Sequence, residues 1–169
     1  MKKSVKLNGF LLVIFTVATI LIYNCGSDTT TNSTTGPAAG TISGTITFAD
    51  TNRVQCALCG YYSISAFATW PPVGPPNGTD SLKLTKSNNT YSATYNIVGL
   101  TGGGNYVLVT AYTKLPYSDS TNYILGIHGC DTSSSCWFSS PKRDTIPSAQ
   151  GLANINFLSW ADTAKGYKF

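Results

Sequence analysis

The chain has 169 residues, of which 42% are hydrophobic and only 11% are charged, with a formal net charge of +4 at pH 7. Three of the eleven basic residues lie within the first six positions, so residues 25–169 carry eight basic against seven acidic residues, a net charge of +1. A nucleic-acid partner, which needs clustered Lys and Arg, is therefore not expected. Glutamate is absent and Thr, Ser, Tyr, Gly and Asn are abundant, a composition that favours an extracellular β protein.

The N-terminal segment has the pattern of an export signal. Three lysines precede an apolar run over residues 10–23, which is shorter than the roughly 20 apolar residues of a membrane span. The run ends at Cys25, and polar, Thr-rich sequence follows at once. In this respect the segment resembles the lipobox signal of bacterial lipoproteins. An uncleaved amphiphilic anchor and an ordinary secretory signal with an incidental cysteine are the alternatives.

The lipoprotein resemblance implies that residues 1–24 form a signal helix that is removed by cleavage before Cys25. The Cys25 thiol would then carry a diacylglyceryl group and the new amine an acyl chain, and two or more acyl chains anchor a protein stably. The implied partner is a membrane, bound through these N-terminal acyl chains. The implied location is the extracytoplasmic side of the bacterial cell envelope, and Gly26 after the lipidated cysteine favours the outer membrane.

Residues 25–40 comprise the lipidated cysteine and a low-complexity Ser/Thr/Gly/Pro tether. As a flexible coil this tether has a reach of roughly 20 Å. Residues 41–169 then form a single domain, which opens on a strand over residues 41–48 with Ile42, Ile46 and Phe48 on one face.

Further strands of period two are predicted at residues 61–70, 81–86, 90–98 and 105–114. In the first of these, one face would carry Tyr62, Ile64, Ala66, Ala68 and Trp70. A tight hairpin is expected at residues 87–89, because Asn adopts left-handed turn conformations easily. The strand over residues 105–114 has large or apolar residues on both faces, which predicts a central place in the sheet.

Residues 115–150 are expected to be largely irregular, with one short strand at residues 123–127. A last strand is predicted at residues 152–158, with Ala153, Ile155 and Phe157 inward. The pattern predicts an all-β fold, a single antiparallel β-sandwich of about seven strands.

Three segments together resemble the carboxypeptidase regulatory-like, or transthyretin-like, β-sandwich. They are GTISGTITF at residues 40–48, YSATY at residues 91–95, and the strand after the glycine turn with Gly104, Tyr106 and Leu108. The resemblance implies a fold and a surface-protein context but no activity. The chain departs from that family in its cysteines and in the long insertion after Tyr112.

Four cysteines remain after Cys25, as C-x2-C at Cys56 and Cys59 and as C-x5-C at Cys130 and Cys136. An even number in an exported domain predicts two disulfides, and we favour the local pairing within each motif because both motifs lie in turn-like segments. The alternative is a tetrahedral zinc site formed by the same four thiolates. No other cofactor is expected.

The single histidine, His128, limits the catalytic chemistry that the chain can support. A Ser-His-Asp arrangement would depend on His128 with a neighbour such as Asp131, and nothing singles out a serine partner. The seven aspartates are scattered singly, and paired-carboxylate glycosidase chemistry has no glutamate to use. We therefore expect a protein that is not an enzyme.

Aromatic residues at strand ends and in loops are the remaining candidates for a site. The candidates for stacking on a ligand are Trp70, Trp137 and Trp160. Three tyrosines also lie at strand ends or in loops, namely Tyr61, Tyr117 and Tyr123. The alternative is that these rings only cover the ends of the core.

The sequence predicts a lipid-anchored cell-envelope protein, a non-catalytic accessory or binding module with an envelope protein or a glycan as partner. The alternatives are a carbohydrate-binding module that uses exposed aromatic residues, a structural envelope or appendage protein that pairs through an edge strand, and a zinc-binding module.

Overall fold

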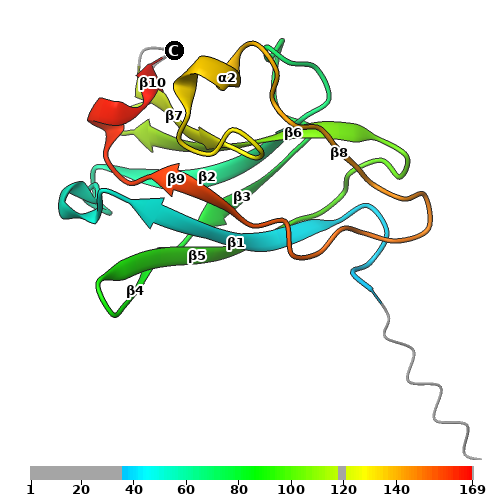
Figure 1. The fold of residues 1–169 in the computed structure, drawn as a ribbon, viewed down its shortest axis with the longest axis horizontal. Coiled ribbons are helices and arrows are strands. Elements are labelled where there is room, and N and C mark those ends of the chain that lie inside the picture. The colour runs from blue at the N-terminus through cyan, green and yellow to red at the C-terminus, as the bar shows by residue number, and fades with distance from the viewer. Residues whose placement is uncertain (1–35, 118–120, 169) are drawn as a thin grey trace, which may run out of the picture. The chain divides into compact units, whose positions relative to one another are not determined.

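Two β-sheets face each other in the computed structural model, which describes residues 36–117 and 121–168 (Figure 1). The predicted signal peptide, the lipidated Cys25 and most of the predicted tether lie outside the described residues. Residues 35–169 form a compact unit of their own. The described part contains ten strands and three short helical segments.

Sheet A has the strand order β4 (Thr85–Ser87), β5 (Thr90–Ile97), β1 (Ile42–Ala49), β9 (Phe157–Trp160). Sheet B has the order β10 (Tyr167–Lys168), β7 (Asn122–Ile127), β6 (Asn105–Lys114), β2 (Gly60–Phe67), β3 (Gly78–Leu82), and β8 (Asp144–Thr145) pairs with the start of β6. The helical segments are η1 (Thr51–Arg53), α2 (Ser134–Trp137) and η3 (Thr163–Lys165). The all-β sandwich predicted from the sequence is confirmed.

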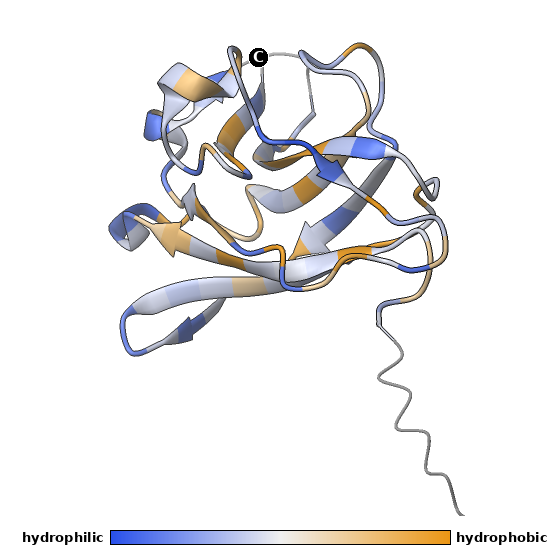
Figure 2. Ribbon diagram, turned by 45° about the vertical axis from the view of Figure 1, so that its right-hand side comes forward, coloured by the Kyte–Doolittle hydropathy of each residue, from blue (hydrophilic) through white to orange (hydrophobic). Residues whose placement is uncertain are grey.

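The main core lies between the sheets and is made by the alternate residues that the sequence pattern selects. In β1 the residues Ile42, Ile46 and Phe48 are buried. The core also includes residues of β2, β5 and β6, namely Tyr62, Ile64, Ala66, Ala93, Tyr95, Ile97, Leu108 and Tyr112. Figure 2 shows the hydrophobic residues on the strands and hydrophilic residues at the β4–β5 turn, where Asn88 and Asn89 both have positive φ as the predicted hairpin requires.

Strand β6 lies in the middle of sheet B, as its two apolar faces predict. Its inward side chains, among them Leu108 and Tyr112, join the main core. Its outward Val107 and Val109 belong to a second, smaller core on the outer face of sheet B. This second core is completed by Ile127 at the end of β7 and by Cys130 and Trp137 from the segment that follows β7.

The observed strand bounds differ from the predicted ones at two places. The single strand predicted at residues 81–86 is two strands, β3 in sheet B and β4 in sheet A, with the crossing at residues 83–84. The strand predicted at residues 61–70 ends at Phe67, so Ala68 and Trp70 do not continue the inward row of Tyr62. The ladder ends there because the Ala68 N–H bonds to the Asn77 side chain at 2.8 Å, and Pro71 has no N–H with which to resume it.

The last strand begins later than predicted, at Phe157, and Ala153 is exposed instead of inward. Asn154 has a φ of 60°, a left-handed conformation that ends regular strand pairing. The preceding residues still follow β1, since Ser43 N donates to Leu152 O at 2.9 Å. Strand β9 is parallel to β1, which is the one parallel pairing among the described strands of a sheet pair otherwise antiparallel.

Candidate functional site

A groove of about 500 Å³ lies on the outer face of sheet B, on the half that the second core leaves open. Its floor is made by the outward side chains of four neighbouring strands, β3, β2, β6 and β7. The loop over residues 70–76 and Tyr117 add to its walls. The lining residues are Tyr61, Ser63, Ser65, Phe67, Trp70, Pro72, Pro76, Thr79, Ser81, Val109, Ala111, Thr113, Tyr117, Asn122, Tyr123 and Ile124.

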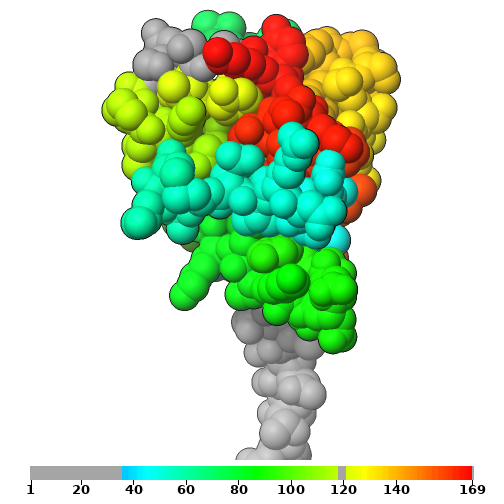
Figure 3. Space-filling view, turned by 90° about the vertical axis from the view of Figure 1, so that its left-hand side faces the viewer, coloured from blue at the N-terminus to red at the C-terminus, as the bar shows by residue number. Residues whose placement is uncertain are grey.

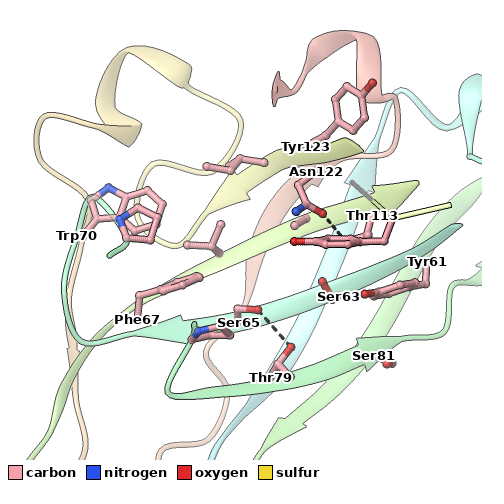
Figure 4. A pocket seen from close by; sticks show the side chains of 16 residues that line it. Tyr61, Ser63, Ser65, Phe67, Trp70, Thr79, Ser81, Thr113, Asn122 and Tyr123 are labelled. Atoms are coloured by element: carbon pink, nitrogen blue, oxygen red, sulfur yellow. Dashed lines mark hydrogen bonds between the residues drawn. The ribbon is translucent and has the colours of Figure 1, made fainter. Parts of the chain in front are cut away.

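Strand β2 supplies the long axis of the floor. Because successive side chains of a strand alternate between its faces, the burial of Tyr62, Ile64 and Ala66 turns the odd-numbered residues outward. Figure 4 shows these outward side chains in a row, with Tyr61 at one end, Ser63 and Ser65 between, and Phe67 at the other end beside Trp70. The row therefore has an aromatic ring at each end and hydroxyls in the middle.

The neighbouring strands β3, β6 and β7 add further polar side chains to the floor of the groove. Ser65 Oγ lies 3.2 Å from Thr79 Oγ1 on β3, and Thr79 Oγ1 donates to the Ile64 carbonyl at 3.0 Å. On the other side of the groove, Thr113 Oγ1 donates to Asn122 Oδ1 at 2.8 Å (Figure 4). This bond leaves the amide NH₂ of Asn122 as a donor, so the floor presents fixed polar groups of both hydrogen-bonding kinds.

Trp70 is held at the end of the groove by the second core. Its indole Nε1 donates to the Trp137 carbonyl at 2.6 Å, and its ring stacks on Phe138 with centroids 5.9 Å apart and planes at 15°. Phe67 packs against it at 5.8 Å. Arg143 also ties the loop to this region, because its Nη1 donates to the Ala68 carbonyl at 2.9 Å. Trp70 is therefore positioned before any ligand arrives.

Tyr61, Tyr117 and Tyr123 all line the same groove as Trp70, so the structure brings together four of the six aromatic residues that the sequence singles out. Tyr61 is 48% exposed and Tyr117 is 63% exposed. Large half-exposed rings that border one groove offer flat apolar surface with a polar hydroxyl at the edge.

The other two tryptophans do not reach the groove. Trp137 is completely buried, with its Nε1 donating to the Asp131 carbonyl at 2.9 Å, so its predicted role as an exposed stacking ring is wrong. Its side chain belongs to the second core against which Trp70 packs, and its backbone carbonyl accepts the hydrogen bond from the Trp70 indole. Trp160 is partly buried on β9, with the Lys165 ammonium 4.7 Å from its ring centroid, and it does not line the groove.

The cysteines lie at disulfide distance in the local pairing. The Cα atoms of Cys56 and Cys59 are 5.2 Å apart, and those of Cys130 and Cys136 are 5.7 Å apart, within the range that disulfides span. The alternative zinc site with all four cysteines does not form, because no group of three or more His, Cys, Asp or Glu side chains comes together within the described residues. The second pair closes the segment that carries Trp137.

His128 pairs with Asp144 and not with Asp131. Its Nδ1 lies 2.6 Å from Asp144 Oδ2, both side chains are buried, and Lys142 Nζ lies 3.5 Å from the other carboxylate oxygen. The pair ties the end of β7 to β8, and neither residue lines the groove. Its position indicates a structural hydrogen-bonded pair outside the groove.

Tyr62 of sheet B and Tyr95 of sheet A are both buried in the main core between the sheets. Burial raises the pKa of Tyr62 to about 12, and it also raises the pKa of Tyr95. The Tyr62 hydroxyl is fully engaged, since it donates to the Ala161 carbonyl at 2.6 Å and accepts from Gln55 N at 2.9 Å.

Among the residues described, no helix is long and apolar enough to span a membrane. Comparison with protein-family models, curated proteins and solved structures gave no match.

The hydroxyl row of Ser63, Ser65, Thr79 and Ser81 is the part of the site that sequence reasoning missed. Its only signal is the alternation of Ser and Thr with apolar residues, and solvent-facing positions of any strand show the same pattern.

Proposed function

We propose that the protein is a non-catalytic binding module of the bacterial cell envelope, anchored by lipid at Cys25, and that the groove on sheet B binds a neutral carbohydrate. The observation that carries this proposal is the groove itself, in which aromatic rings stand around a floor of uncharged hydroxyl and amide groups. The resemblance to carboxypeptidase regulatory-like sandwiches is part of the proposal, and the two-sheet architecture is compatible with it.

The lining chemistry matches that of a sugar. A pyranose ring has flat C–H faces that pack on aromatic rings such as Tyr61 and Trp70, and an edge of hydroxyls that both donate and accept. Ser63, Ser81 and Asn122 provide groups of both kinds on the floor. None of the lining residues is charged. A charged ligand would lose its hydration without gaining an ionic partner, so the groove favours a neutral one.

The same lining supports a non-catalytic role. Glycoside hydrolysis uses a pair of carboxyl groups beside the scissile bond. The lining residues include no Asp and no His, and the His128–Asp144 pair is engaged elsewhere. Among the described residues, the lining of the groove can hold a sugar but contains no Asp, Glu or His side chain to act as acid or base in its cleavage.

The edges of the sheets favour a binding module over a structural protein that pairs through strands. The edge strands β4, β9, β3 and β10 have three, four, five and two residues. Short edge strands offer few unpaired backbone groups to a second chain.

Binding of the purified sandwich to a panel of immobilised neutral and acidic glycans tests the proposal. We expect binding to one class of neutral glycan and retention of affinity in Tyr61→Phe. Tyr61→Ala should lose at least about fivefold in affinity, in line with about 1–3 kcal/mol for a stacked ring. Val98→Ala is the control, because Val98 is exposed but lies outside the groove. Binding of acidic glycans alone, or equal binding by Tyr61→Ala, would contradict the proposal.

The anchor is tested separately by the intact mass of the full-length protein purified from membranes. We expect a product that begins at Cys25 with added acyl mass. Four cysteines should become available to alkylation only after reduction. A product without acyl mass, or alkylation of these thiols before reduction, would contradict the anchor or the disulfides respectively.

A further inference from the structure

A second hollow of about 480 Å³ adjoins the groove at the Tyr61 end. Tyr61 and Ser81 line both spaces, so they form a shared border. The second hollow lies where residues 54–57 and the crossing from β3 to β4 meet Tyr91 of β5. Figure 3 shows this end of the molecule, where the segment around η1, in cyan, lies between the C-terminal segment above and the β4–β5 hairpin below.

The chemistry of the second hollow differs from that of the groove. Val54, Leu84 and Tyr91 are partly buried apolar side chains that pack on the main core and leave part of their surface open to the hollow. Lys83 is the single charged residue among those that line it. Where the groove floor carries Ser and Thr, this hollow carries aliphatic and aromatic side chains.

The polar atoms at the back of the hollow are already engaged. The Tyr62 hydroxyl bonds to Ala161 O and Gln55 N, and the Tyr112 hydroxyl donates to the Cys56 carbonyl at 3.3 Å. Gln55 Nε2 donates to the Arg53 carbonyl at 3.0 Å. A sugar placed here would lose hydration with little hydrogen bonding in return, whereas an apolar group would gain from leaving water.

We propose that the second hollow is a subsite for an apolar group of the same ligand, so that the ligand is a neutral glycoconjugate. Its saccharide lies in the groove between Trp70 and Tyr61, and its alkyl or aryl group passes Tyr61 and Ser81 into the hollow beside Val54 and Leu84. This inference rests on the proposed carbohydrate function of the groove. The Cys56–Cys59 disulfide serves the subsite, because Cys56 and Ala57 line the hollow and the cross-link restricts their loop.

Paired methyl and octyl glycosides of glucose, galactose and mannose test the inference. Their affinities for the sandwich are measured by titration calorimetry below the critical micelle concentration, with n-octanol as a further probe. Each methylene group buried strengthens binding by about fourfold. We therefore expect the octyl member of the best pair to bind at least about tenfold more tightly than its methyl partner.

Single substitutions test whether the higher affinity of the octyl glycosides comes from the hollow. Leu84→Ser should remove most of the octyl advantage and leave methyl glycoside binding unchanged, and Val54→Ser repeats the test if Leu84→Ser does not fold. Val98→Ser is the matched control and should keep the advantage. An octyl advantage that survives both hollow variants would overturn the inference.

The outcomes separate the two proposals. If methyl and octyl members bind equally, the subsite is wrong and the carbohydrate function stands. If all octyl glycosides bind as tightly as n-octanol whatever their sugar, the hollow binds alkyl groups without the groove, and both the shared ligand and the carbohydrate function are contradicted. If none of the glycosides and not even n-octanol binds, the subsite is overturned, and the glycan panel decides the carbohydrate function independently.

Discussion

The outer face of sheet B is divided into two halves that use the same strands differently. On one half, residues 127–140 fold back over the sheet and bury Val107, Val109 and Trp137 in a second core. On the other half the strands stay open and their outward residues line the groove. The covered half holds one wall of the open half, because Trp137 binds the indole of Trp70. The comparison shows that the segment that buries Trp137 also positions Trp70 in the wall of the groove.

Strand β6 shows the division within ten residues. Among its outward side chains, Val107 lies under the cover, Val109 belongs to the second core and also lines the groove, and Ala111 and Thr113 lie in the groove. The pairing register of β6 with β7 shifts between Thr110 and Ala111, at the boundary between the halves. The extra residue is Leu125 of β7, because Thr110 pairs with Gly126 and Ala111 pairs with Ile124. An extra residue in one strand of a pair bends that strand locally.

Removing the ring at the centre of the covered half should have the largest effect. Trp137→Ala deletes a fully buried side chain, and such truncations cost about 3–5 kcal/mol of unfolding free energy. Glycan binding should weaken in the fraction that stays folded, because the second core against which Trp70 packs loses its largest side chain. Urea unfolding measures the first effect, with Trp137→Phe as the milder control. A loss below about 1 kcal/mol would mean that the covered half is not a core.

Opening the cross-link of the covered half should come next. The double variant Cys130→Ser/Cys136→Ser should lose about 2–3 kcal/mol of unfolding free energy, the chain-entropy value for a small loop. We expect weaker glycan binding as well, since Trp137 directly follows Cys136. Cys56→Ser/Cys59→Ser is the matched comparison, with a similar loss of stability and intact binding of methyl glycosides. Equal glycan binding by both double variants would contradict the claim that the covered half positions Trp70.

Removal of one hydroxyl from each of the adjacent residues Tyr61 and Tyr62 of β2 compares the two faces of the sheet, with a smaller expected effect on stability. Tyr62→Phe leaves the Ala161 carbonyl and Gln55 N without their partner and should cost about 1–3 kcal/mol of unfolding free energy. Tyr61→Phe removes a hydroxyl on a half-exposed side chain and should change stability by less than about 0.5 kcal/mol. Equal effects in denaturant unfolding would show that the inward and outward rows are not distinct.

Alkaline pH should act on the same inward row. Because the pKa of Tyr62 is raised from 10.0 to about 12, the folded protein retains a proton that the unfolded chain releases between these values. The unfolding free energy should therefore be unaffected by this group below pH 10 and should fall as the pH rises from about 10 to 12. Tyr62→Phe should flatten part of this fall. A tyrosinate absorbance titration in which every tyrosine ionises near pH 10 would contradict it.

The fold was accessible to sequence reasoning where one periodicity governs a segment. Period-two alternation predicts β1, β5 and β6 and their inward faces, and the two apolar faces of β6 predict its central place. It fails where the backbone leaves the strand geometry, as at Asn154 with its left-handed φ and at the crossing near Leu84. The alternation of residue types continues through both places, so it predicts neither the left-handed residue nor the crossing.

The site was accessible only in part, because its members meet through tertiary packing. The aromatic residues at strand ends predict four of the lining rings, but composition cannot distinguish Trp70 in the groove from Trp137 beneath it. That distinction depends on the segment after β7 folding over one half of the sheet. The serines and threonines of the floor carry no signal beyond that of an ordinary exposed strand face.

The most direct test of the account is a map of amide chemical shifts of the sandwich, residues 35–169, titrated with the three methyl glycosides. We predict shifts that saturate with one sugar and cluster on β2, β3 and the loop of Trp70, with little change at residues 127–136. Shifts that cluster away from the groove would contradict the claim that the open half of sheet B is a carbohydrate site.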